Sequence, residues 1–234
     1  MKIGGVQKIS LIDFPGKIAA VVFTQGCNFR CQFCHNESLV LPEKFGLGTD
    51  MDEFFDFLGE RKRKIDAVVV SGGEPTLHHD LDAFLCRVKD LGFLSKLDTN
   101  GTNPQILQNL FHKNLLDYVA MDIKHSFAKY GEIVGVEIDV ERIKLSIDLI
   151  KNSGVDYEFR TTIVPQFHGQ DDIKSIALQI SGARRFALQK FVPDHAINKN
   201  LTGANSIFDP ENEKILRDVV KFCESHVGEI ILRN

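Results

Sequence analysis

Short apolar runs alternate with amphipathic segments along most of this chain, and that alternation constrains its fold more than any other feature. Six of the runs are typical of buried parallel strands, because they are short and apolar and alternate with helical segments. The helices between them supply the right-handed crossovers that parallel strands need. The expected strands are AAVVFTQ (19–25), AVVVSGGEP (67–75), FLSKLDTNG (93–101), DYVAMDIK (117–124), YEFRTTIVP (157–165) and RFALQKFVP (185–193).

The length of the chain limits how far such a sheet can close. A closed barrel of eight strand-helix units typically takes about 250 residues, whereas this chain has 234 residues and six clear units. We therefore predict an α/β fold, an open partial barrel of parallel strands with about six β/α units. No linker divides the chain, so residues 1–234 are expected to form one domain, with residues 1–18 as an appended N-terminal hairpin and 229–234 as a further edge strand.

Charge and hydropathy exclude two classes of partner. The formal net charge of −4 provides no positive field for nucleic acid or for an anionic membrane surface. No segment approaches the roughly 18 to 20 consecutive apolar residues of a spanning helix, and the first residues lack the apolar centre of a secretory signal. We expect a cytoplasmic protein with neither nucleic acid nor membrane as a partner.

Unusual polar residues occur where the expected strands end. Parallel α/β proteins bind ligands beyond the carboxyl ends of their strands. Here a cysteine-rich loop follows the first strand and a double-glycine turn ends the second. The later strands end in Asp98, Thr99 and Asn100 and in Asp122 and Lys124, and Arg160 lies within the fifth.

Three of the five cysteines lie in the segment CNFRCQFCHN (27–36). This C-x3-C-x2-C spacing lets one loop hold three thiolates around one inorganic centre, and in a cytosolic protein it favours metal ligation over disulfides. A [4Fe–4S] cluster normally takes four cysteines, so Cys27, Cys31 and Cys34 would leave one iron open to an outside ligand. A zinc site, for which the adjacent His35 is a poorly placed fourth ligand, and a redox disulfide in the loop are alternatives.

The two remaining cysteines, Cys86 and Cys223, fall on the apolar faces of expected helices. We predict that both are buried core residues. Two cysteines are too few for additional ferredoxin-like clusters, so one cluster is expected, and its electron has to come from outside the chain.

The cysteine loop resembles the motif of the radical S-adenosylmethionine superfamily, including the aromatic Phe33 directly before the third cysteine. The resemblance extends over nearly the whole chain, because further segments are similar, in the same order, to the glycyl-radical-enzyme activases. Those segments are SLIDFPGKIAAVVFTQ (10–25), VVVSGGEPTL (68–77), LDTNG (97–101), MDIK (121–124) and FRTTIVP (159–165). The three-cysteine motif is highly specific to the superfamily, whereas the identity of the client enzyme is much less specified.

The resemblance implies roles for the residues at the strand ends. Cys27, Cys31 and Cys34 would bind one [4Fe–4S] cluster and act in catalysis, with Phe33 beside the cofactor. In the family the SGGEP turn binds the amino group of S-adenosylmethionine, which implies that role for its Gly-Gly-Glu residues. That set is Gly72, Gly73 and Glu74.

The other polar residues have a structural alternative beside the implied one. Asp98, Thr99 and Asn100 would contact the ribose of the cofactor, or else form a capping turn. Asp122 and Lys124 lie two apart on a strand and face one side, where Lys124 would pair with the cofactor carboxylate. Arg160 could do likewise, and the alternative for these charges is an ion pair inside the barrel.

The implied activity is a radical reaction on a partner protein. S-adenosylmethionine would be cleaved reductively to a 5′-deoxyadenosyl radical, which abstracts hydrogen from a glycine of a glycyl radical enzyme. Anaerobic ribonucleoside-triphosphate reductase is the expected client, and flavodoxin or ferredoxin the expected electron donor. Alternatives are activation of pyruvate formate-lyase or another glycyl radical enzyme, a radical reaction on a small molecule, and a non-enzymatic electron carrier.

One position departs from the relatives that act on pyruvate formate-lyase. Those relatives have a histidine near the end of the sixth strand, whereas this chain has Val192 near that place and His195 further on. The departure weakens pyruvate formate-lyase as the client and leaves the contact of the sixth strand with the cofactor open.

Overall fold

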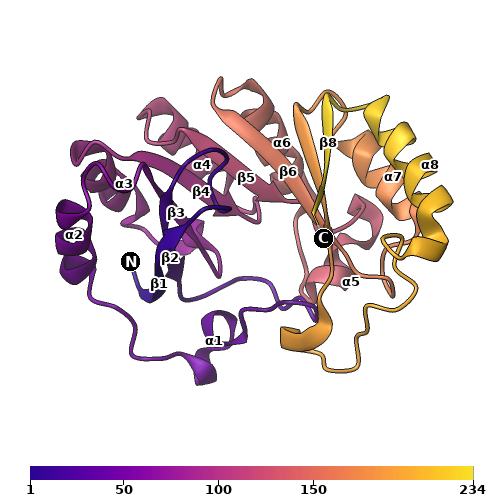
Figure 1. Ribbon diagram of the computed structural model, residues 1–234, viewed down its shortest axis with the longest axis horizontal. Coiled ribbons are helices and arrows are strands. Elements are labelled where there is room, and N and C mark those ends of the chain that lie inside the picture. Colours follow the sequence, from indigo (N-terminus) through magenta and orange to yellow (C-terminus); the bar gives the residue numbers. More distant parts are fainter. Residues whose placement is uncertain (234) are drawn as a thin grey trace.

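The computed structural model describes residues 1–233, which form one eight-stranded sheet whose strands follow chain order. Strands β2 to β8 run parallel, and β1 pairs antiparallel with β2. The sheet curves without closing, so the expected open partial barrel is confirmed (Figure 1). The strands are β1 (Ile3–Ser10), β2 (Ala19–Thr24), β3 (Ala67–Gly72), β4 (Leu94–Thr99), β5 (Tyr118–Asp122), β6 (Asp156–Ile163), β7 (Arg185–Lys190) and β8 (Glu229–Arg233).

The helices connect these strands and cover the outer face of the sheet, with α2 and α3 at one end and α7 and α8 at the other (Figure 1). No helix within residues 1–233 combines the length and the apolar character needed to cross a bilayer. The α-helices are α1 (Glu37–Val40), α2 (Met51–Glu60), α3 (Leu81–Asp90), α4 (Pro104–His112), α5 (Tyr130–Val134), α6 (Val140–Asn152), α7 (Gln170–Gln179) and α8 (Glu213–Glu224). Single 3-10 turns occur at Pro42–Lys44, Pro75–Leu77, Phe127–Lys129, Pro193–His195 and Pro210–Asn212.

The N-terminal segment differs from its expected form. Residues 1–18 do not make a hairpin of their own: β1 pairs with β2, with Val6 opposite Val22, and 11–18 form the connecting turn. Without β1, the backbone N–H and C=O groups along one side of β2 would lie unpaired at a sheet edge, which β1 covers. The expected edge strand at the other end is confirmed for 229–233, because β8 pairs parallel with β7; position 234 lies outside the described residues.

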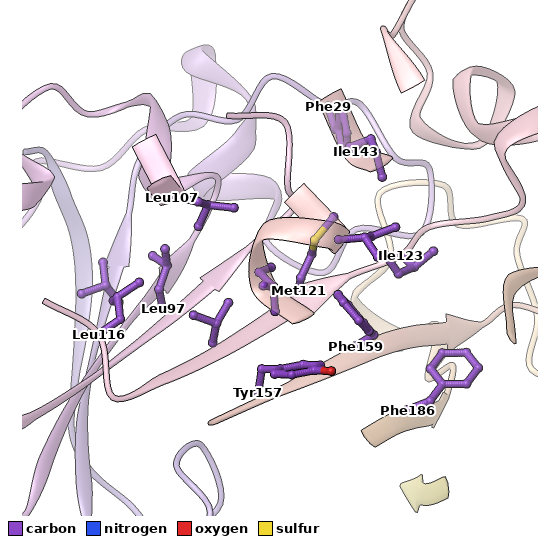
Figure 2. Close-up of a cluster of buried hydrophobic side chains, with 14 of the residues drawn as sticks. Phe29, Leu97, Leu107, Leu116, Met121, Ile123, Ile143, Tyr157, Phe159 and Phe186 are labelled. Carbon is purple, nitrogen blue, oxygen red and sulfur yellow. The ribbon is translucent and has the colours of Figure 1, made fainter. Parts of the chain in front are cut away.

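The central strands are apolar on both faces because two separate cores cover them. The larger core fills the space between the sheet and the helices; in Figure 2, Leu97, Met121 and Phe159 of three adjacent strands lie in it with Leu107 of α4 and Ile143 of α6. Figure 2 also labels Phe29, Leu116, Ile123, Tyr157 and Phe186.

The smaller core lies inside the barrel. It is built mainly from small strand residues and is completed by Phe14, whose ring lies 5.6 Å from that of Tyr118. The buried Lys96 ammonium donates to the Asp13 carbonyl at 2.6 Å. The turn after β1 therefore closes the amino end of the barrel and leaves the carboxyl end for a ligand.

The two cysteines outside the loop have different environments. Cys223 of α8 is buried, as expected, whereas Cys86 of α3 is exposed. The prediction for Cys86 was wrong because α3 turns its contact stripe of Leu81, Phe84, Leu85 and Val88 toward the sheet, and Cys86 falls beside that stripe.

Candidate functional site

A cavity of about 230 Å³ lies at the carboxyl ends of β2 to β6. It brings together residues from the ends of five strands that are far apart in the sequence. Twelve of the thirteen residues expected from the sequence line it; Glu74 does not. The lining consists of Cys27, Phe29, Cys31, Phe33, Cys34, His35, Asn36, Val40, Ser71, Gly72, Gly73, Asp98, Thr99, Asn100, Asp122, Lys124, Arg160 and Thr162.

The cysteine loop is shaped by main-chain contacts on both sides. Its own turn is closed by the Cys34 amide, which donates to the Cys31 carbonyl at 3.1 Å. On one side the Arg30 amide donates to Val134, which follows β5; on the other the Ile197 amide donates to Cys34, at 2.8 and 3.0 Å. The loop is thus held in place by segments that follow two other strands.

The donor set fits an iron–sulfur cluster. Backbone amides of Phe29 and Asn36 donate to the sulfurs of Cys27 and Cys34, both at 3.4 Å, and hydrogen bonds to sulfur are one means by which proteins tune such clusters. Burial raises the pKa of Cys27 to about 12 and that of Cys31 to about 11. These thiols therefore ionise only with a strong partner, and a coordinated metal deprotonates its thiol ligands outright.

The same geometry does not match a single-ion site. Within residues 1–233, no three His, Cys, Asp or Glu side chains are placed to hold one metal ion. In a cubane cluster each thiolate binds a different iron, so its ligands need not converge on one point. In this arrangement these side chains do not form the zinc site that the sequence left as an alternative.

The double glycine is required by its contacts with the neighbouring loop. Gly72 has φ +114°, and a Cβ there would lie 2.3 Å from the Thr24 nitrogen; a Cβ on Gly73 would lie 2.0 Å from the Gly26 carbonyl oxygen. The Gly73 and Glu74 amides donate to the Thr24 and Gly26 carbonyls at 2.9 and 2.8 Å. The turn therefore packs directly on the segment that leads into the cysteine loop, and its glycines also line the cavity.

Glu74 has a different place from the one expected. Its carboxylate is fully buried and accepts four hydrogen bonds: from the amide and hydroxyl of Thr76, the hydroxyl of Thr99 and the amide of Asn100, at 2.5–3.1 Å. Burial raises its pKa, against these hydrogen bonds. Glu74 thus joins the ends of β3 and β4 and positions the cavity wall without lining it.

We expect Glu74→Gln to lower the free energy of unfolding by about 1–3 kcal/mol, because an amide NH₂ would face hydrogen-bond donors. Urea denaturation of the metal-free protein measures this loss. The exposed Glu43→Gln is the matched control. Equal unfolding midpoints for the two variants would contradict the role of Glu74 in joining the ends of β3 and β4.

Thr99 and Asn100 line the cavity, and their side chains are already hydrogen-bonded to other residues of the protein. The Thr99 hydroxyl donates to Glu74. The Asn100 amide donates to Asn28 at 2.8 Å, and its carbonyl accepts from Thr102 at 2.7 Å. These residues therefore form a turn, and that turn is a wall of the cavity; their contact with the ribose stays a prediction.

A chain of largely buried, paired charges crosses the floor of the cavity. Arg160 donates from Nε to Asp122 at 2.8 Å and from Nη1 to Asp98 at 3.1 Å. Lys124 Nζ lies 3.0 Å from Asp122, and Lys96 Nζ lies 2.8 Å from Asp98. The ion pairs considered as the alternative from the sequence are therefore present, at the surface of the cavity.

The ionisation of these groups follows from their pairing. Burial disfavours charge on Asp122, but Arg160 and Lys124 outweigh it and hold its pKa well below the usual range. For Asp98, Arg160 and Lys96 likewise outweigh burial and lower the pKa. Burial also opposes the charge of Lys124, yet the adjacent Asp122 raises its pKa. Lys124 is therefore a permanent cation, with two of its three N–H donors not used by Asp122.

Six lining residues were not expected from the sequence. His35 stacks on Phe191, which follows β7, with ring centroids 5.7 Å apart. Asn36 donates from its side chain to the Gly72 carbonyl at 3.3 Å. His35 and Asn36 could have been predicted, because they follow the third cysteine of the loop. No sequence signal indicated the other four lining residues, which are Phe29, Val40, Ser71 and Thr162.

Comparison with known proteins places the chain in a family. Residues 21–177 match the model of the Radical SAM superfamily. A Methanocaldococcus jannaschii protein provisionally named a glycyl-radical enzyme activating enzyme is 38% identical over 239 residues, covering 99% of this chain and 95% of the relative. The pyruvate formate-lyase-activating enzyme of Listeria monocytogenes is 35% identical over 135 residues, covering 53% of each chain.

Solved structures share the fold at low sequence identity. Streptococcus suis SuiB bound to S-adenosylmethionine superposes with a TM-score of 0.70 at 14% identity over 92% of this chain, which spans about half (50%) of SuiB. A domain of the pyruvate-formate lyase-activating enzyme from Bacteroides vulgatus gives 0.55 at 16% identity, covering 72% of this chain and 99% of that domain.

The chain belongs to the radical SAM superfamily. Its parallel open barrel and the three cysteines after the first parallel strand agree with that class. Within the superfamily it groups with the glycyl-radical enzyme activating enzymes, because its similarity to the Methanocaldococcus relative covers almost the full length of both chains.

Proposed function

We propose that this protein binds one [4Fe–4S] cluster through Cys27, Cys31 and Cys34, and that it uses S-adenosylmethionine to form a glycyl radical in a partner enzyme. The observation that carries this proposal is the convergence of three cysteines and a paired cationic side chain on one cavity. When bound and reduced, the cluster supplies the electron that cleaves the sulfur to C5′ bond of S-adenosylmethionine.

The residues of this chain bind and orient S-adenosylmethionine before it is cleaved. The Lys124 ammonium, already oriented by Asp122, offers its remaining donors to the cofactor carboxylate. The Gly72–Gly73 turn presents backbone groups toward the amino group, and Asp98 to Asn100 line the side where the ribose would lie. Phe33 and Phe29 exclude water from the reacting end, and Arg160 holds both floor carboxylates ionised.

Among glycyl radical enzymes, we propose anaerobic ribonucleoside-triphosphate reductase as the client to test first. Val192, 48% exposed after β7, stands near the place where activases of pyruvate formate-lyase have a histidine, and this departure argues against that client. Several relatives are nevertheless named for pyruvate formate-lyase, so it is the second client to test.

We propose an external electron donor, flavodoxin or ferredoxin. The two cysteines outside the loop lie on separate helices, Cys86 exposed on α3 and Cys223 buried on α8. They do not form a second cluster site within the described chain.

The test is anaerobic reconstitution with iron and sulfide, followed by dithionite and S-adenosylmethionine, with 5′-deoxyadenosine measured by chromatography. We expect 5′-deoxyadenosine from the loaded protein and, when purified anaerobic reductase is added, the electron paramagnetic resonance signal of a glycyl radical. A loaded cluster that yields no 5′-deoxyadenosine would overturn the radical chemistry. Product without a glycyl radical on the anaerobic reductase or on pyruvate formate-lyase would leave the radical chemistry standing and point to another glycyl radical enzyme or to a small-molecule substrate.

A further inference from the structure

Two buried histidines lie directly behind the cavity without lining it. His125 follows β5 and His168 follows β6, and their side chains are 0% and 2% exposed. Their rings stack with centroids 4.9 Å apart and an interplanar angle of 28°. A stacked pair of buried imidazoles is stable only if both rings stay neutral and every ring nitrogen finds a partner.

The hydrogen bonds of the pair are reciprocal between the two loops. His125 Nε2 lies 3.0 Å from the carbonyl oxygen of Phe167, and His168 Nε2 lies 2.9 Å from that of Lys124. Because a carbonyl only accepts, each Nε2 has to carry the proton. Each loop therefore donates a histidine N–H to the backbone of the other.

The Nδ1 atoms complete this pattern as acceptors. The Ser126 amide donates to His125 Nδ1 at 2.7 Å, and the Val164 amide donates to His168 Nδ1 at 3.1 Å. A charged group, Asp172, lies 3.7 Å from His125 Nε2 and is itself paired with Lys129. Burial lowers the pKa of His168 to about 4, so that ring stays neutral at physiological pH.

Of the two carbonyls that receive these hydrogen bonds, one belongs to Lys124, a lining residue of the cavity, and the other to Phe167, which packs on the lining residue Phe33. Lys124 lines the cavity, and its amide is held by the Tyr130 hydroxyl at 3.3 Å. Phe167 packs on Phe33 with ring centroids 6.3 Å apart, and Lys124 Nζ lies 5.9 Å from the Phe33 ring. The histidine pair thus holds the backbone beneath the cation and the aromatic wall beside it.

We propose that His125 and His168 are a positioning pair that sets Lys124 for the carboxylate of S-adenosylmethionine. The inference rests on the proposed function, because it assumes that this cofactor binds at the cavity. Neither histidine lines the cavity, so both act only through the backbone of Lys124 and Phe167.

A double-mutant cycle separates positioning from a general structural role. His168→Ala is expected to weaken S-adenosylmethionine binding by about fivefold to tenfold, the equivalent of one hydrogen bond, with unchanged iron content. In a Lys124→Met background, His168→Ala is expected to weaken S-adenosylmethionine binding by less than about twofold, because the cation that His168 positions is absent. His168→Gln, which keeps an N–H donor, is expected to recover most of the affinity.

The measurement is the dissociation constant of the cluster-loaded protein by equilibrium dialysis. The exposed His112→Ala at the end of α4 is the matched control and is expected to bind like the wild type. An equal loss with and without Lys124, or no loss at all, would overturn the positioning role.

A second measurement needs neither cluster nor cofactor. Nitrogen-15 spectra of the metal-free protein are expected to show both imidazoles as neutral Nε2–H tautomers at pH 7; the other tautomer or a protonated ring would overturn the inference. If the tautomers are as expected and the loaded wild type fails to bind S-adenosylmethionine, the proposed function falls and this role falls with it. If the wild type binds and His168→Ala binds equally well, only the inference falls.

Discussion

Replacement of Cys27, Cys31 or Cys34 by alanine is expected to abolish stable cluster loading and all formation of 5′-deoxyadenosine. The three thiols line one cavity, and no other cysteine lies near enough to substitute, since Cys86 and Cys223 belong to α3 and α8. With one of the three cysteines removed, the cluster keeps only two of the four cysteine ligands that such clusters normally have. Iron and sulfide analysis after anaerobic reconstitution, with the absorption spectrum, measures the loss.

The chain offers a matched control for this experiment. Cys86 is exposed and lies outside the cavity, so Cys86→Ala is expected to load iron and form product like the wild type. Normal iron content in all three loop variants would contradict the cluster assignment. Loss in Cys86→Ala alone would show that a different cysteine set binds the metal.

Arg160→Met is expected to lower the free energy of unfolding by about 3–5 kcal/mol at pH 7, because it leaves buried carboxylates without their shared partner. Arg160 bridges Asp98 and Asp122, and the exposed fraction of the three side chains is 14%, 11% and 29%. Denaturant unfolding of the metal-free protein measures the change. Arg184→Met is the control: its side chain is 54% exposed and lies 3.9 Å from Asp156, so we expect about 0–1 kcal/mol.

The pH dependence of this difference has a definite sign. In the wild type the pKa values of Asp98 and Asp122 are lowered, so the pairing stabilises the protein above the unfolded pKa of about 3.9 and is lost as the pH falls through the lower folded values. In Arg160→Met the carboxylates protonate more readily. The stability gap between the two proteins is therefore expected to be widest at neutral pH and to shrink below about pH 5; a gap that stays constant down to pH 3 would contradict this account.

Much of the site could be predicted because its residues are marked locally. The spacing of Cys27, Cys31 and Cys34 carries a chemical meaning within eight residues. The polar groups of β4 and β5 directly follow apolar runs whose alternation defines the strands. Since parallel strands place their carboxyl ends at one edge of the sheet, local sequence and topology together brought twelve expected residues to one cavity.

Two further errors arose where a side chain had two possible directions. Glu74 was expected to face the cofactor because of its neighbours in the motif, yet its carboxylate turns inward to Thr76, Thr99 and Asn100. Cys86 lies one residue from the contact stripe of α3, and a helix rotation too small to read from periodicity decides its exposure. Neither direction is a property of the local segment alone.

The sequence by itself determined the succession of strands and helices, the open barrel of parallel strands and the cysteine loop, because each depends on hydrophobic period, turn residues or spacing within a few positions. Only the tertiary structure decided that β1 covers the edge of β2, that Arg160 joins Asp98 to Asp122, and that His125 and His168 exchange hydrogen bonds between two loops. These contacts join residues 38 or more positions apart in most cases. Their energies arise from desolvated partners that meet only once the sheet has curved, so no local pattern records them.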